Sequence, residues 1–76
     1  MKKESMNIYM AALGEKSEGI GYTSLHYTLE GAVKQAKKWI SESYFEWKEL
    51  PAQGSDIRNW EGGCDYIEIK ERKIQN

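Results

Sequence analysis

Apolar and polar positions near the N-terminus predict a β-hairpin. Residues 7–13 are rich in side chains that favour strands, and residues 20–27 alternate in part between apolar and polar. Between them, residues 14–19 contain two glycines and three charged side chains, which is the composition of an exposed turn. In the second strand, Leu25 and Tyr27 are expected on one side, and Ile20 and Tyr22 on the other.

A single long amphipathic helix is predicted after this hairpin. The hydroxyl of Thr28 suits an N-cap, and Glu30 in the first turn complements the helix dipole. Apolar side chains then recur with the helical period of about 3.6 residues and form one stripe. Because Pro51 disfavours helical geometry at the residue before it, the helix is expected to run from residue 29 to about residue 49. The stripe consists of Leu29, Ala32, Val33, Ala36, Trp39, Ile40, Tyr44, Trp47 and Leu50.

Phe45 is the large apolar side chain that projects onto the charged side of this helix. Two interpretations account for it. Either the helix ends near Ser43 and residues 44–50 are extended, or Phe45 lies exposed on a continuous helix for a reason other than packing. The periodicity by itself is compatible with both.

The C-terminal third of the chain predicts a second hairpin. Residues 51–56 have the composition of a loop, residues 57–60 form a short strand, and residues 64–71 form a better one. Gly62 and Gly63 suit the turn between these strands. In the last strand, Ile67 and Ile69 are expected to face one way, and Tyr66, Glu68 and Lys70 the other.

These elements predict the α+β class, with a small antiparallel sheet and one long amphipathic helix on one face, in the order ββαββ. With 76 residues, the chain is expected to form one small domain, with residues 1–5 and 74–76 loose at its ends. Because one helix covers only one face of a sheet, the other face is expected to be free for a partner or for self-association.

Composition limits the partners and the cellular compartments that are expected for the protein. The 11 basic and 12 acidic side chains give a net charge of -1, so nothing in the overall charge favours nucleic acid or anionic lipid. The longest apolar run, residues 8–13, is far shorter than the about 20 residues of a membrane-spanning helix. A signal peptide is not expected either, and Cys64 is the only cysteine, so the protein is expected to be cytoplasmic.

Catalytic motifs are sparse in this sequence. Cys64 and His26 are the only residues of their kinds, and a Cys–His enzyme built on them is the weakest functional hypothesis. Asp56, Glu61 and Asp65 lack the alternate-position oxygens of a calcium loop, and no glycine-rich loop has the sequence of a phosphate site. The sequence therefore predicts a protein that is not an enzyme and that holds no metal or cofactor.

Nucleic-acid binding is the alternative hypothesis, because basic side chains gather in two places. One group lies on the predicted helix and the other near the end of the last strand, and Phe45 is placed to stack on a base. Acidic residues at helical spacing from these lysines also fit an ordinary solvated helix surface. The basic residues concerned are Lys34, Lys37, Lys38, Lys70, Arg72 and Lys73.

Aromatic side chains carry the leading hypothesis. The chain has 3 Trp, 5 Tyr and 1 Phe, which is more aromatic surface than one helix on one sheet face easily buries. Exposed Tyr and Trp are enriched at protein interfaces. The sequence therefore predicts a small non-enzymatic module that binds another protein, as a regulator or inhibitor. The predicted contacts are Tyr22, Tyr27, Phe45, Trp60 and Tyr66.

Overall fold

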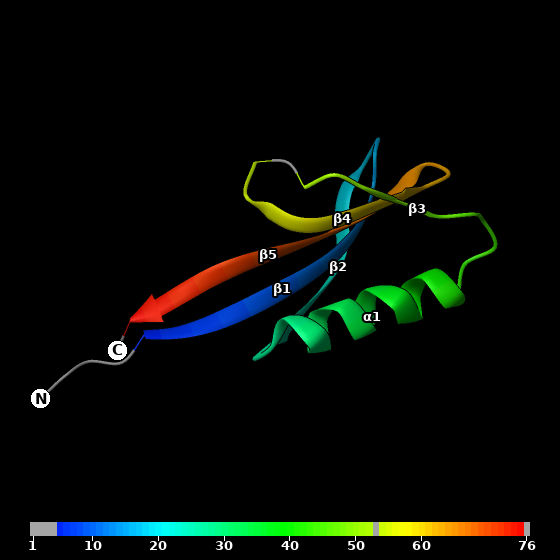
Figure 1. Ribbon diagram of the computed structural model, residues 1–76. Helices are drawn as coiled ribbons and strands as arrows, with labels where there is room; N and C mark the ends of the chain where they lie inside the picture. The colour runs from blue at the N-terminus through cyan, green and yellow to red at the C-terminus, as the bar shows by residue number, and fades with distance from the viewer. Residues whose placement is uncertain (1–4, 53, 76) are drawn as a thin grey trace, which may run out of the picture.

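Five antiparallel strands form one sheet, and a single helix packs against it (Figure 1). The computed structural model describes residues 5–52 and 54–75. The strands lie in the order β2-β1-β5-β4-β3. The elements are β1 (Ser5–Glu15), β2 (Gly19–His26), α1 (Leu29–Ser41), β3 (Lys48–Leu50), β4 (Asp56–Gly62) and β5 (Asp65–Gln75).

The predicted α+β class and the antiparallel sheet are confirmed, but the predicted order ββαββ is only partly right. The chain order is ββαβββ, because Lys48–Leu50 form the additional strand β3 and pair with β4. The sequence placed these residues at the end of the helix. Trp47 and Leu50 fit the helical stripe, and that local pattern does not report the pairing of Lys48–Leu50 with a distant strand.

The helix ends at Ser41 and does not reach residue 49. Hydroxyl groups compete for its last carbonyl groups, since Ser41 Oγ donates to the carbonyl of Lys38 and Ser43 Oγ to that of Ile40, each at 2.8 Å. The indole Nε1 of Trp47 in turn donates to Ser43 Oγ at 2.5 Å. The interpretation in which the helix ends near Ser43 and the following chain is extended is therefore confirmed for β3.

The strands β1 and β5, the first strand of the first predicted hairpin and the last strand of the second, are longer than the sequence indicated. Gly14 and Glu15 belong to β1 and not to the turn, and β5 continues to Gln75, which pairs with Ser5. The prediction of loose ends at residues 5 and 74–75 is thus wrong, because each strand supplies the other's hydrogen-bonding partner. Residues 1–4 and 76 lie outside the described residues.

Small side chains let the helix approach the sheet closely. Ala32 and Ala36 of α1 and Ala11 of β1 are fully buried, together with Ile67 and Ile69 of β5. The predicted N-cap is confirmed, because the Thr28 side chain accepts a hydrogen bond from the Gly31 amide at 3.0 Å. These contacts define a helix-covered face, and Figure 1 shows α1 along that side of the sheet.

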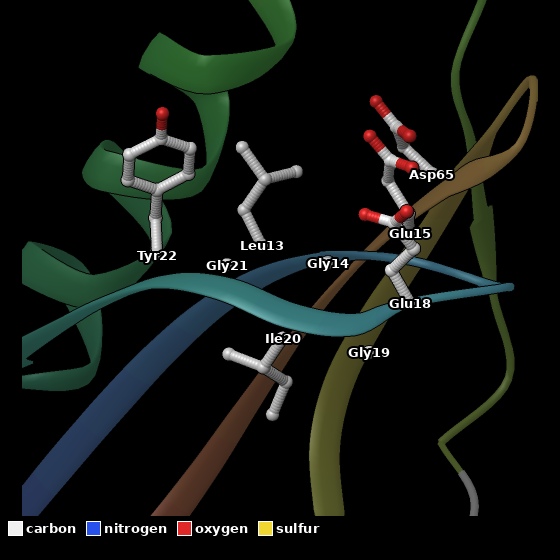
Figure 2. A pocket seen from close by; sticks show the side chains of 9 residues that line it. All are labelled: Leu13, Gly14, Glu15, Glu18, Gly19, Ile20, Gly21, Tyr22 and Asp65. Atoms are coloured by element: carbon white, nitrogen blue, oxygen red, sulfur yellow. The ribbon is translucent and has the colours of Figure 1, made fainter.

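A β-bulge in β2 changes which way its first residues point. Leu13 pairs with Tyr22 and Gly14 pairs with Ile20, so Gly21 is left without a partner in β1. Figure 2 accordingly shows Tyr22 beside Leu13 on one side of the strand and Ile20 on the other. The prediction that Ile20 and Tyr22 share a side is therefore wrong, because one extra residue inverts the alternation.

Candidate functional site

Trp60, one of the predicted contacts, belongs to the core. Its side chain is only 5% exposed, it pairs with Ile67 on β5, and the guanidinium of Arg58 lies 5.0 Å from its ring. The prediction of an exposed Trp60 is wrong. The strand β3 pairs with β4 on its outer side, with Glu49 opposite Trp60, whereas the sequence pattern predicted helix for those residues.

Two other predicted aromatic contacts cover glycines. A Cβ at Gly14 would lie 2.7 Å from Cζ and Oη of Tyr66, so this ring lies over Gly14 and is half-buried. Phe45 packs against Gly63 at the turn between β4 and β5, and its side chain is 47% exposed. Both rings are therefore partly committed to the fold.

The remaining predicted contacts, Tyr22 and Tyr27, are 68% and 79% exposed. They are part of a larger group on and just after β2, which we call the β2 apolar edge. Sequence reasoning missed most of this group, although one signal was present: Gly19–His26 contains no Asp, Glu, Lys or Arg. The β2 apolar edge consists of Ile20, Tyr22, Leu25, Tyr27 and Leu29.

The two edges of the sheet differ in how they are protected. At one edge, β3 has three residues, two of them charged, and Pro51 follows it. Short length, charge and proline are the usual devices that prevent an edge strand from pairing with another chain. At the other edge, β2 is eight residues long and uncharged, and no strand of the described residues pairs with its outer side. The strand β2 is therefore the edge that is open to pairing.

A shallow hollow of about 190 Å³ lies at the start of β2 (Figure 2). Leu13 and Tyr22 stand at one end of it, and the carboxylates of Glu15, Glu18 and Asp65 gather at the other. The turns of the two hairpins meet here, because the Lys16 amide donates to the Cys64 carbonyl at 2.9 Å. Lys16 is paired with Glu61, and the three carboxylates have no ion pair within the described part of the chain.

The predicted basic residues form separate groups on the two faces. Lys34, Lys37 and Lys38 are exposed on α1 and line a hollow together with His26, Gly31, Gln35 and Ser41. They lie beside the end of β2. Lys70 lies on the face without the helix, where its Nζ is 3.7 Å from Asp56. Arg72 and Lys73 follow on β5, opposite Ile8 and Asn7 of β1. The structure thus does not gather the six residues into one patch.

Glu68 has the most unfavourable carboxylate environment on the face without the helix. Its side chain is only 18% exposed, and burial raises its pKa above the ordinary value, with a further increase from the nearby carboxylate of Asp56. The ammonium of Lys70, 3.8 Å away, acts in the opposite direction and is the smaller effect. At neutral pH, Glu68 therefore opposes folding as an anion.

Replacing Glu68 with glutamine is expected to stabilise the protein at pH 7 by up to about 1 kcal/mol. Since the folded-state pKa is raised, the stabilising contribution of Glu68 is complete below its unfolded pKa of about 4.3 and is lost as the pH rises. The gain from Glu68→Gln should accordingly vanish near pH 4. Urea unfolding at both pH values measures this, with the exposed Glu46→Gln as control; a loss of stability at pH 7 would contradict it.

The proposed Cys–His pair is not assembled. His26 pairs with Tyr9, whereas Cys64 lies in the turn beside Glu15 and Lys16, at the far end of β1. Six residues of strand separate these positions, which corresponds to about 20 Å at about 3.3 Å per residue. His26 instead lies 2.7 Å from Ser24 Oγ through its Nε2, and Cys64 is exposed and free.

Within residues 5–52 and 54–75, no cluster of three or more His, Cys, Asp or Glu side chains is arranged to hold a metal ion. None of the described helical residues forms a segment long and apolar enough to cross a bilayer. Comparison with protein-family models gives no match, and comparisons with curated proteins and with solved structures give none either.

Proposed function

We propose that this chain is a protein-interaction module that receives an extended strand along β2. One observation carries the proposal: among the described residues, seven large hydrophobic side chains are exposed, and five of them form the β2 apolar edge. Addition of a strand to an open sheet edge uses main-chain hydrogen bonds for affinity and neighbouring side chains for specificity. The edge strand β2 supplies both, because it is uncharged, long and bordered by exposed apolar groups.

Aromatic side chains at this edge support the proposal further. Tyr22 and Tyr27 offer a rigid apolar body with a polar tip, which is a frequent source of binding energy at interfaces. The edge β3 lacks these features, so one partner strand is expected per molecule. Regulation or inhibition of a larger protein remains the predicted role. The cytoplasm remains the predicted compartment, since an exposed thiol such as Cys64 persists best in a reducing environment.

Site-specific photo-cross-linking in a lysate of the native host tests the proposal. A photoreactive phenylalanine analogue at Tyr22 is expected to give a protein adduct, whereas the same group at Tyr44, which is fully exposed but lies after the helix, is not. Adducts that nuclease treatment removes would instead support the alternative, nucleic-acid binding through Lys34, Lys37 and Lys38. Equal labelling from Tyr22 and Tyr44 would contradict the proposed use of β2.

A further inference from the structure

We infer that the strand received by β2 is the β2 strand of a second copy of this chain, paired antiparallel around a two-fold axis. This inference rests on the proposed function and specifies its partner. Two features of β2 favour this partner: the opposite charges at its two ends and the pattern of side chains along it.

Opposite charges flank the two ends of β2. Its first residue, Gly19, lines the hollow that contains Glu15, Glu18 and Asp65. Its last residue, His26, lines the hollow that contains Lys34, Lys37 and Lys38. None of these six charged side chains has an ion pair within 4.0 Å in the described ranges. Lys37 lies near enough to Glu49 to lower the pKa of that carboxyl, so the charges available to a neighbouring molecule are the other five.

Antiparallel pairing brings these ends together in a complementary way. In a two-fold dimer the start of each β2 lies beside the end of the other, so the acidic end of one copy meets the basic end of the second copy twice. Both groups belong to the helix-covered side. The lysines are on α1 itself, and Figure 2 shows the carboxylates on the same side of the strand as Leu13 and Tyr22. A parallel arrangement would place like charges beside each other and is disfavoured.

The side chains of β2 also suit pairing with themselves. With Thr23 on the axis, Tyr22 lies opposite Ser24 of the second copy, and both belong to the helix-covered side. The bulge at Gly21 then places Ile20 opposite Leu25 of the second copy, on the face without the helix. Ile20 and Leu25 are both exposed in the single chain, and pairing would bring each against the other. Apolar residues directly opposite each other stabilise a sheet, so this contact favours the dimer.

Oligomeric state measured by sedimentation equilibrium tests this inference on the purified full chain. The wild-type protein is expected to dimerise with increasing concentration. Thr23→Lys places two like charges opposite each other on the axis, so it should weaken dimerisation about tenfold or more. The control Ala52→Lys adds the same charge at an exposed position near the other edge and should leave dimerisation unchanged.

Charge reversal in complementary pairs tests the antiparallel arrangement separately. The variants Glu15→Lys/Glu18→Lys and Lys34→Glu/Lys38→Glu should each dimerise about tenfold more weakly than the wild type, because like charges then meet at both ends. An equal mixture of the two variants restores opposite charges at both ends, so heterodimers should form with near wild-type affinity. Circular dichroism confirms that each variant is folded before it is compared.

A wild-type chain that stays monomeric at millimolar concentration would overturn the inference, as would a dimer that Thr23→Lys leaves intact. Failure of the mixed variants to recover would also overturn it. These failures are distinguishable from failure of the proposed function. If the wild type is monomeric but Tyr22 still cross-links to a different protein, the second copy is excluded and binding through β2 stands.

Discussion

Replacing Trp60 with alanine is expected to destabilise the protein by about 3–5 kcal/mol. Trp60 is the largest side chain of the buried cluster, and its neighbours Ile67 and Ile69 are held in β5, which is paired with β1 on one side and β4 on the other. They cannot close a cavity of this size without breaking the sheet. For a small domain of marginal stability, this loss removes most of the free energy of unfolding.

Thermal unfolding followed by circular dichroism measures this effect. A domain of this size loses about 4–8 °C in Tm for each kcal/mol, so the transition of Trp60→Ala should fall by about 15 °C or more. Tyr44→Ala removes an aromatic ring that is fully exposed and should change stability by less than about 0.5 kcal/mol. If the Trp60→Ala variant had the same Tm as the Tyr44→Ala variant, the assignment of Trp60 to the core would be contradicted.

Replacing Gly62 with alanine is expected to cost about 1–3 kcal/mol, because the position has no room for a Cβ. A Cβ there would lie 2.7 Å from Cε2 and 2.8 Å from Cγ of Trp47. The indole is not free to move, since its Nε1 donates to Ser43 Oγ and the ring packs against the core. The added methyl group therefore displaces either Trp47 or the turn between β4 and β5.

A double-mutant cycle with Trp47→Ala tests the cause of this loss. Once the indole is removed, Gly62→Ala should cost much less than it does in the wild type, since the clash is absent. Gly21→Ala is the matched control, because a Cβ there meets only the Leu13 carbonyl oxygen at 3.9 Å and should have little effect. Equal costs for Gly62→Ala with and without Trp47 would refute the packing explanation.

Local signals along the chain predicted most of the secondary structure. The cap at Thr28, the apolar stripe of the helix and the glycines of the turns act between residues close in sequence, so they can be recognised without the fold. The alternation that places Ile67 and Ile69 on the buried face is of the same kind, and both side chains are fully buried. The errors arose where a partner distant in the sequence decides the secondary structure. Lys48–Leu50 are one example, since they are a strand because they pair with β4.

The candidate site was less predictable, because exposure is a property of the assembled sheet. Trp60 and Tyr22 are both aromatic residues in strands, and nothing local distinguishes them. Trp60 lies on an inner strand with β3 outside it, so it is buried, whereas Tyr22 lies on the edge and is exposed. The missing charge in Gly19–His26 was visible in the sequence, but its meaning depends on β2 being the edge.

The sequence by itself determined the α+β class, the start of the helix, the presence of the two hairpins and the apolar side of β5, because each depends on short-range geometry and periodicity. Only the tertiary structure decided the strand order, the bulge at Gly21, the burial of Trp60 and the placing of opposite charges at the two ends of β2. These features depend on contacts between residues far apart in the chain. A local pattern has no means of encoding which strand becomes the edge.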